Sequence, residues 1–287
     1  MKGGAIGLVV HPHRALGLEV AVAAGRWLLE RGYTVRVAAA DGAPLAALAD
    51  HVVDDARFAD GLDLAVSIGG DGTMLRTVRL VSITGTPILG VNVGHLGYLT
   101  LVEPDGWQPA LERVLSGDYD VEERMTLDVA RVGPGGTSTV ARTALNDAVV
   151  EKLEAGHTVR VGVTISGQPA ISYAADALIV ATPTGSTAYN LSAGGPVVSP
   201  RLEAVLVTPV AAHSLFGRAL VVARHEVVRV EVLDGAAVLG IDGRHCGRLA
   251  RGDAIECRAG EVPARLITFG ERDFWRVITA RFGLGLP

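Results

Sequence analysis

Hydrophobic residues in the first part of the chain follow two alternating spacings, that of a strand and that of an amphipathic helix. Apolar runs predict strands at 5–10, 34–40, 62–68 and 87–93. The run at 62–68 is continuous, as in a strand that is buried on both faces. Helical spacing covers 15–31, which Gly32 ends, and a shorter stretch at 74–81. Strands that alternate with helices predict a doubly wound, parallel α/β sheet.

The pattern changes near Gly117, where short strands separated by turn residues begin to dominate. The expected strands are 126–132, 158–166, 177–181, 204–208, 227–233 and 265–268, with turn signals such as Ser166-Gly167 between them. We therefore expect an α/β domain at 1–117 and an all-β, β-sandwich-like domain at 118–269. Residues 272–282 return to helical spacing, and we expect the segment 270–287 to pack back on the first domain.

Composition limits the class of protein. Of 287 residues, 49% are hydrophobic and 20% charged, which excludes disorder for most of the chain. The longest uncharged stretch, 177–200, carries three prolines, three glycines and many hydroxyls, so it cannot form a spanning helix. The first residues lead straight into a strand without the plan of a signal peptide. A soluble, cytoplasmic protein that does not bind membranes is expected.

Charge and residue usage exclude several functions. The net charge of -5 and the absence of a basic stripe disfavour nucleic-acid binding. The two lysines, Lys2 and Lys152, do not follow a glycine, so the chain has no P-loop, and the strand lysine of protein kinases is also missing. Cys246 and Cys257 are too few for a disulfide scaffold or a zinc site, and packing roles are expected for both.

The strongest local signal is Gly69-Gly70-Asp71-Gly72-Thr73, which lies between a buried strand and a helix. In doubly wound sheets, ligands bind at the carboxyl ends of strands, where glycines and a helix N-terminus suit a phosphate. Asp71 would then accept a proton or hold a magnesium ion. The structural alternative is a tight turn in which Thr73 caps the helix and Asp71 favours its dipole. Three glycines around one aspartate favour the functional interpretation.

A second signal spans 181–196, which is rich in small and hydroxyl residues. Such a segment suits a loop that binds a polar ligand through its amides and hydroxyls, with Tyr189 available to stack on a ring. The alternative is an irregular surface loop. A serine-hydrolase elbow does not fit, because Ser186 lacks the required flanking glycines.

Taken together, four segments resemble the NAD kinase family over nearly the whole chain. They are GGDGT at 69–73, NVGHLGYL at 92–99, Asn146-Asp147, and TPTGSTAYNLSAGGP at 182–196. The first motif is related to those of diacylglycerol-type lipid kinases and phosphofructokinases. The long fourth segment is highly specific to the NAD kinases.

The resemblance implies phosphorylation of the 2′-hydroxyl of the adenosine ribose of NAD, which gives NADP. It makes Asp71 the general base, assisted by magnesium that arrives with a nucleotide such as ATP. Asp71, Gly72, Asn146 and Asp147 would contact NAD, Arg76 would face phosphates, and Asp176 would bind a ribose or the nicotinamide end. The adenosine part would lie against Thr187, Ala188, Tyr189, Asn190, Leu191 and Ser192. His157, Ala211 and Arg244 align with further contact positions.

Some positions depart from the family pattern. Asp147 stands where glutamate is common, Ala174 where many members have arginine, Ala177 where glycine is usual, and Arg244 where some have glutamine. These departures leave the preference between NAD and NADH open. The donor is also open between ATP, another triphosphate and polyphosphate. The resemblance further implies a homodimer or homotetramer, with the pocket between the domains and Asp176 reaching a neighbouring subunit's pocket.

Two other functions remain as alternatives, and some histidines remain unassigned. A GGDGT-type lipid kinase would lack the TPTGSTAY segment, and a non-catalytic NAD or NADP sensor would be expected to have lost Asp71. His11 and His13 end the first strand beside the same crevice, and a metal site there lacks an evident third ligand. His213 follows a strand in a segment that the family uses near its ligand.

Overall fold

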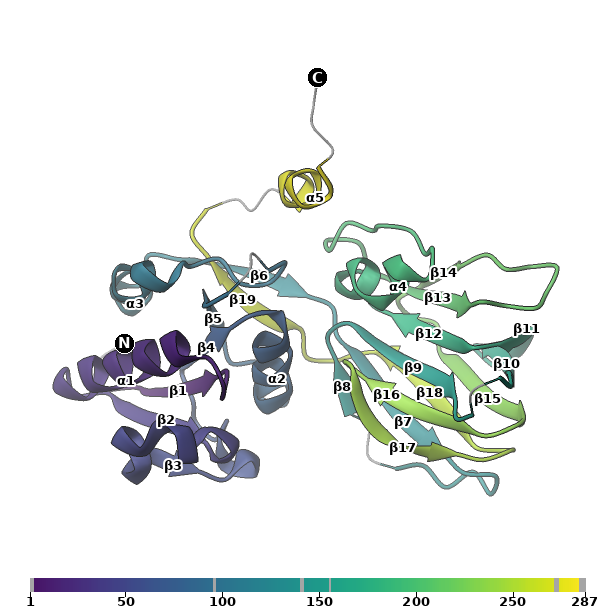
Figure 1. Cartoon of the computed structure of the whole chain (residues 1–287), viewed down its shortest axis with the longest axis horizontal. Coiled ribbons are helices and arrows are strands. Elements are labelled where there is room, and N and C mark those ends of the chain that lie inside the picture. The colour runs from purple at the N-terminus through teal and green to yellow at the C-terminus, as the bar shows by residue number, and fades with distance from the viewer. Residues whose placement is uncertain (1–2, 95–96, 140–141, 155, 271–273, 284–287) are drawn as a thin grey trace. The chain divides into compact units, whose positions relative to one another are not determined.

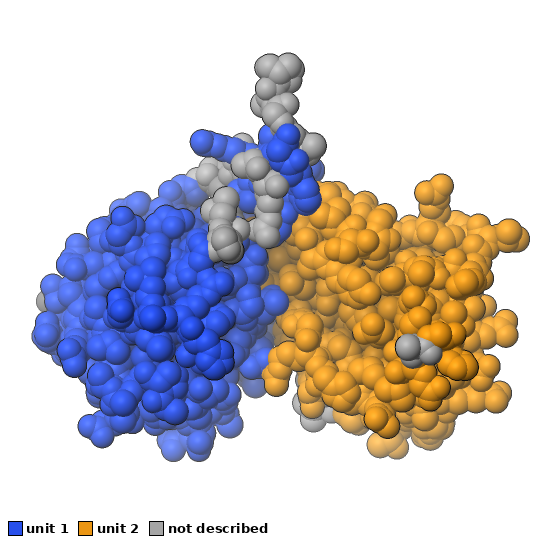
Figure 2. All heavy atoms as spheres, viewed as in Figure 1, with its two compact units in different colours: residues 1–123, 262–287 blue, residues 124–261 orange. Residues whose placement is uncertain are grey.

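The computed structural model describes residues 3–94, 97–139, 142–154, 156–270 and 274–283. The chain forms two compact units, one of residues 1–123 with 262–287 and the other of residues 124–261 (Figure 2). The boundaries differ from those expected from the sequence. Residues 118–123 and 262–269 belong to the first unit, because their strands complete its sheet rather than that of the all-β unit.

The first unit is built on a seven-stranded sheet of order β3-β2-β1-β4-β5-β19-β6 (Figure 1). The strands are β1 (Ala5–Val10), β2 (Thr34–Ala38), β3 (Val52–Val53), β4 (Leu64–Gly69), β5 (Ile88–Asn92), β6 (Asp120–Arg124) and β19 (Ala264–Thr268). Neighbouring strands from β3 to β19 pair in parallel. β4 and β5 are buried along their whole length, which agrees with their continuous apolar sequences.

Helices cover both faces of this sheet. They are α1 (Ala15–Glu30), α2 (Asp71–Val81) and α3 (Trp107–Ser116), with short 3-10 helices at Ala39–Asp41, Ala43–His51, Asp55–Arg57 and Pro104–Gly106. α1 and α3 share one apolar cluster with Leu89 and Val91 of β5. Gly90 between them faces the side chain of Met74 on α2. Successive strand residues point to opposite faces, so α2 covers the other side and the doubly wound prediction is confirmed.

The second unit contains two six-stranded antiparallel sheets. The β10 sheet has the order β11 (Gln168–Ala175), β10 (Val159–Ile165), β15 (Val228–Asp234), β18 (Ala254–Ala259), β7 (Leu127–Val132) and β8 (Arg142–Ala144). The β12 sheet has the order β14 (Leu220–Ala223), β13 (Ala204–Val210), β12 (Ala177–Ala181), β9 (Asp147–Lys152), β16 (Ala237–Ile241) and β17 (Arg244–Leu249). Ser166-Gly167 forms the predicted turn between β10 and β11.

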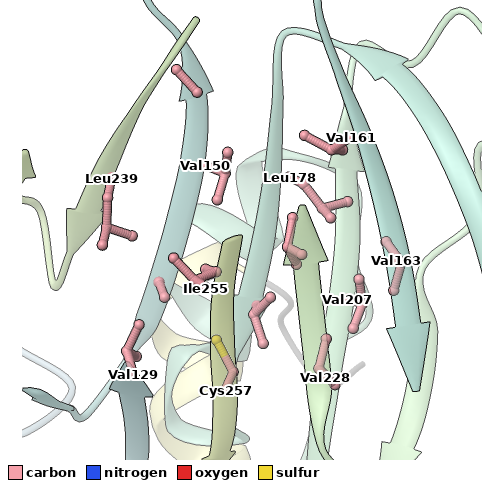
Figure 3. Packing of buried hydrophobic residues seen from close by; sticks show 14 of the residues in the cluster. Val129, Val150, Val161, Val163, Leu178, Val207, Val228, Leu239, Ile255 and Cys257 are labelled. Carbon is pink, nitrogen blue, oxygen red and sulfur yellow. The ribbon is translucent and has the colours of Figure 1, made fainter. Parts of the chain in front are cut away.

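Side chains from the two sheets meet in one apolar core. Val161 and Ile255 of the β10 sheet pack with Val150, Leu178 and Val207 of the β12 sheet (Figure 3). The β-sandwich-like architecture is therefore as expected. Cys257 is also buried there, and burial raises the pKa of its thiol. Cys246 is half-buried and accepts a hydrogen bond from Nη1 of Arg142 at 3.4 Å, a basic partner that the sequence did not suggest.

β12 is buried on both faces, and this positions the hydroxyl-rich segment. Leu178 points into the sandwich core, whereas Ile179 belongs to a second cluster with Val198 on the outer face. The covering segment contains a 3-10 turn, Thr184–Thr187, and the short helix α4 (Tyr189–Ser192). The segment at 181–196 is therefore packed on the β12 sheet rather than loose on the surface.

Residues after β19 include the helix α5 (Phe274–Phe282), which lies within the predicted 272–282, and the start of that prediction falls outside the described residues. It belongs to the first compact unit. Within the described ranges, the structure contains no helix that is long and apolar enough to cross a membrane.

Because β12 is buried on both faces, we expect a large loss of stability when one of its core side chains is shortened. Leu178 is 0% exposed, so Leu178→Ala should lower the free energy of unfolding by about 2–5 kcal/mol through lost contacts and a cavity. Val221→Ala is the control in the same sheet, because Val221 is 61% exposed and should change stability by less than about 0.5 kcal/mol. Urea unfolding measures both, and equal effects would contradict this packing.

Candidate active site

The GGDGT motif forms the turn from β4 into α2. β4 ends at Gly69, Gly70 precedes the helix, and Asp71 is its first residue. The alternative in which Thr73 caps the helix is therefore wrong: α2 begins two residues earlier and Thr73 lies buried in its first turn. A Cβ on Gly69 would overlap the Thr73 side chain, so the motif needs glycine there for space.

The carboxylate of Asp71 is fixed by a second segment of the sequence, the NVGHLGYL motif. Its Oδ2 accepts the backbone N–H of Tyr98 at 2.9 Å, and its Oδ1 accepts that of Leu99 at 3.0 Å. A Cβ on Gly97 would overlap Oδ1, which explains a glycine at this position. His95 and Leu96 of the motif lie outside the described residues. The two motifs thus form one local structure around a single carboxylate.

This arrangement suits proton transfer beside a phosphate. Asp71 is partly exposed and lies in the first turn of α2, whose unpaired N–H groups favour anions. Each carboxylate oxygen uses one lone pair on a backbone N–H and keeps another. The side chain is therefore held in one orientation and can still accept a proton. Gly72 is exposed in the same turn, with open space around it.

Arg76, predicted to face phosphates, instead engages a buried acid with one of its nitrogens. Its Nη2 lies 2.6 Å from Oδ2 of Asp41 and 2.7 Å from the carbonyl oxygen of Val10. Asp41 is 0% exposed and also accepts the N–H of Val10 at 3.0 Å. This pair ties the end of β1 to α2. Sequence reasoning missed Asp41, which is a single acid among alanines with no local pattern.

In the second unit, Asn146 and Asp147 are held by Asp242, which the sequence analysis did not select. Asp242 and Gly243 have φ values of 48° and 73° and join β16 to β17 in a two-residue hairpin turn. The Asp242 carboxylate accepts the N–H groups of Leu145, Asn146 and Asp147 at 2.9, 2.8 and 3.2 Å. The Asp-Gly dipeptide after an apolar run was a usable turn signal, but its contact partners are distant in sequence.

Asp147 is the acid whose pKa is shifted most among the described residues of the candidate site. It is 4% exposed, and burial, followed by the negative charge of Asp242, raises its pKa to about 7. A buried carboxyl of this kind changes between donating and accepting a hydrogen bond near neutral pH. Asp147 can therefore recognise hydroxyl groups of a ligand in either form.

Many polar side chains of the 181–196 segment form hydrogen bonds to other parts of the chain and so hold the segment in shape. Thr182 donates to the carbonyl oxygen of Leu145 at 2.5 Å, and Ser186 bonds both backbone groups of Val198. Asn190 is buried, donates to the carbonyl oxygens of Ser186 and Pro196, and accepts the Thr208 hydroxyl at 2.6 Å. The expectation that its hydroxyls as a group face a ligand therefore needs correction, because the most buried ones already have partners.

The exposed members of this segment are the ones that remain available to a ligand. Thr187, Ala188 and Leu191 are half-buried, and Tyr189 and Ser192 are exposed. Tyr189 is 38% exposed, and burial, with the nearby charges of Glu151, Asp176 and Asp147, raises the pKa of its hydroxyl. The structure thus brings Tyr189, Asp147 and Asp176 of one chain within electrostatic reach of one another. Asp176 also accepts Nζ of Lys152 at 2.6 Å.

The remaining predicted contact residues lie at the surface of the second unit. His157 lines a cavity of about 490 Å³ together with Lys152, Arg160, Ala174 and His213. Ala211 follows β13 with a φ of 48°, a conformation that few residues other than glycine adopt. Arg244 is exposed at the start of β17, directly after the Asp242-Gly243 turn.

Metal ligands are not clustered in the part of the chain that the structure describes. No group of three or more His, Cys, Asp and Glu side chains there could hold a metal ion. The rings of His11 and His13 lie 6.2 Å apart between centroids.

Comparison with known proteins assigns both parts of the chain to one family. Residues 6–119 match the ATP-NAD kinase N-terminal domain, and residues 145–269 match the ATP-NAD kinase C-terminal domain. An NAD kinase of Heliobacterium modesticaldum is 41% identical over 286 residues, which cover 98% of this chain and 99% of that protein. NAD kinase 2 of Streptomyces avermitilis is 40% identical over 283 residues, which cover 96% of this chain and 93% of that protein.

Solved structures show the same fold. Yeast NADH kinase complexed with NADH superposes with a TM-score of 0.89 at 24% identity, over 98% of this chain and 87% of that one. An NAD kinase from Archaeoglobus fulgidus in complex with ATP has a TM-score of 0.70 at 23% identity, over 97% of each chain. With both domains matched and relatives about 40% identical over nearly its whole length, the chain belongs to the NAD kinase family.

Proposed function

We propose that this protein transfers a phosphoryl group from ATP, or from another polyphosphate donor, to the 2′-hydroxyl of the adenosine ribose of NAD. The observation that carries the proposal is the Asp71 carboxylate, fixed by the N–H groups of Tyr98 and Leu99 at the N-terminus of α2. The names of the relatives support an NAD kinase over a lipid kinase or a sensor. Formation of NADP from NAD and ATP is the direct test.

In the proposed reaction, Asp71 accepts the proton of the 2′-hydroxyl as its oxygen attacks the terminal phosphorus of the donor. The new O–P bond forms while the bond to the leaving diphosphate breaks, and the leaving group keeps that electron pair. The N–H groups at the start of α2 stabilise the negative charge on the transferred group. Magnesium held by the donor phosphates and Asp71 would neutralise part of that charge.

NAD recognition is proposed for the second unit. Asn146 and Asp147 would bind ribose hydroxyls, and the exposed ring of Tyr189 would stack on adenine. Thr187, Ala188, Leu191 and Ser192 would line the same surface, whereas the buried side chain of Asn190 would hold the segment in shape. Gly72, His157, Asp176, Ala211 and Arg244 remain predicted contacts with the dinucleotide.

We also propose that the protein works in the cytoplasm as a homodimer or homotetramer. Leu215 is fully exposed, with 111% of its reference area, and the adjacent Phe216 is 44% exposed. Neighbouring large apolar side chains of this kind favour burial against another protein surface. A second copy of the chain would cover them and would bring Asp176 toward a neighbouring pocket.

The base role of Asp71 predicts a specific loss of rate. Asp71→Asn should lower kcat about 10²–10⁴-fold while NAD still binds, because the amide cannot take up the proton. Asparagine would place its NH2 group against one of the two backbone N–H groups, so loss of rate alone could reflect a disturbed loop.

Turnover and NAD binding together separate the two explanations. A kcat within about tenfold of the wild type, or a loss of NAD binding as large as the loss of kcat, would contradict the proposed role. Asp55→Asn is the matched control, because Asp55 also begins a short helix and is exposed. Its kinetics should equal those of the wild type.

The buried Asp147 predicts a pH-dependent stability. Its pKa rises from 3.8 to about 7 on folding, so the folded state takes up a proton between these values. The free energy of unfolding should therefore fall as pH rises through this window and level off above it, by an amount on the order of 4 kcal/mol. Asp147→Asn should remove this slope in denaturant titrations, and the exposed control Asp60→Asn should retain it. An unchanged slope in Asp147→Asn would refute the assignment.

A shared pocket predicts complementation between inactive variants. Asp71→Asn and Asp176→Ala subunits, mixed and reassembled, would form about half mixed dimers, each with one intact pocket, so about a quarter of wild-type activity should return. Native mass spectrometry verifies the mixed species. No recovery in verified mixtures would assign both aspartates to the pocket of one chain. The proximity of Asp176 to Tyr189 in the same chain makes this a real alternative outcome.

A further inference from the structure

The residues that follow β1 lie at the same sheet edge as the GGDGT turn. The N–H of His11 donates to the carbonyl oxygen of Ile68 at 2.9 Å, and the N–H of Val93 donates to that of Gly69 at 3.1 Å. The carboxyl ends of β1, β4 and β5 are therefore adjacent, and their parallel pairing places the three following loops side by side. Ligands of doubly wound sheets bind at this edge.

Arg14 extends this edge with a fixed positive charge. Its Nη1 donates to the carbonyl oxygen of Val93 at 2.6 Å. A Cβ on Gly94 would overlap the guanidinium, so the glycine of the Asn92-Val93-Gly94 sequence leaves the space that the arginine occupies. The side chain is thus held across the end of β5, and its guanidinium carries further N–H donors besides this one.

The position of Arg14 is unfavourable for the helix that it precedes. It is the N-cap of α1, its side chain makes no capping hydrogen bond, and the first turn of α1 has no acidic residue. A cation at the positive end of a helix dipole lowers helix stability. Serine, threonine or aspartate would serve a purely structural role better. An arginine here makes sense if an anion occupies the space beside it.

Two imidazoles complete the group. The N–H of His13 donates to Nδ1 of His11 at 3.3 Å, and the two rings meet edge to face. Burial, followed by the charges of Arg14 and His13 and more weakly of Arg76, lowers the pKa of His11, while a backbone hydrogen bond acts in the opposite direction. Asp41 is already engaged by Arg76. The strongest charges acting on His11 are all positive, so an anion would be stabilised there.

We propose that His11, His13 and Arg14 bind the polyphosphate chain of the phosphoryl donor beside Asp71. The inference rests on the proposed function and specifies its donor subsite. Most of the proposed NAD contacts lie in the second unit, whereas the transferred phosphorus must lie at the N-terminus of α2, at this edge of the first unit. The ligand class is a linear polyphosphate, carried by ATP or free, and recognition does not involve the base of the nucleotide.

The first experiment detects binding without turnover. Inorganic tripolyphosphate is titrated into the protein while the imidazole resonances of His11 and His13 are followed by NMR. The pKa of His11 should rise, because an adjacent anion stabilises the imidazolium. NAD in place of tripolyphosphate should leave these resonances unchanged. Absence of a shift with tripolyphosphate, or an equal shift with NAD, would overturn the proposal.

The second experiment separates donor binding from NAD binding. Arg14→Gln should raise the KM for ATP and the dissociation constant of tripolyphosphate about 10- to 100-fold, the usual effect of losing one charge-assisted contact, with the KM for NAD unchanged. Arg14→Lys should recover part of the loss. Arg26→Gln, on the exposed side of the same helix, is the matched control and should behave as the wild type.

The outcomes also distinguish the subsite from the overall function. Equal rises in the KM for ATP and for NAD in Arg14→Gln would indicate a general disturbance and reject the subsite. Binding of ATP without binding of tripolyphosphate would place recognition on the nucleoside and also reject it. If the wild type made no NADP with any donor, the proposed function would fail, while the tripolyphosphate titration would still decide whether this edge binds polyphosphate.

Discussion

The geometry of the first unit depends on two hydrogen bonds to one carboxylate. The N–H groups of Tyr98 and Leu99 bind the two oxygens of Asp71, and Gly97 leaves room for this approach. The contact joins the turn after β4 to the loop after β5, and it leaves the carboxylate at the start of α2. An acid in this place is a structural anchor, and the proposed function also makes it the proton acceptor. Its two roles act at the same atoms.

The second unit depends on a comparable constraint with a different purpose. Asp242 binds three successive N–H groups at the start of β9 and so fixes Asn146 and Asp147. Its negative charge also helps to keep Asp147 protonated up to about neutral pH. One acid is therefore placed for backbone recognition, and its neighbour for hydrogen bonding to hydroxyls. Burial, rather than residue type, makes the two aspartates behave differently.

The sequence predicted what depends on local periodicity and missed what depends on distant contacts. Apolar spacing identified β1, α1, β4 and the all-β character of the second unit. It assigned β19 to the wrong unit, because a five-residue strand does not reveal the sheet that it joins. Asp41 and Asp242 act on residues far away in the chain, so no spacing rule could indicate them. The hydroxyls of 181–196 were recognised, but whether each would face inward or outward depended on the packing against β12.

The packing of the 181–196 segment on β12 affects which property of the protein a substitution in that segment changes first. Ser186 and Asn190 form hydrogen bonds with other parts of this chain rather than facing a ligand, and their segment lies on the buried outer face of β12. The conformational entropy of this segment is therefore lost during folding rather than during ligand binding. Sequence drift at these two side chains should act first on the yield of folded protein, and only secondarily on affinity. The surface that meets a ligand is thus maintained by selection on folding as much as by selection on binding.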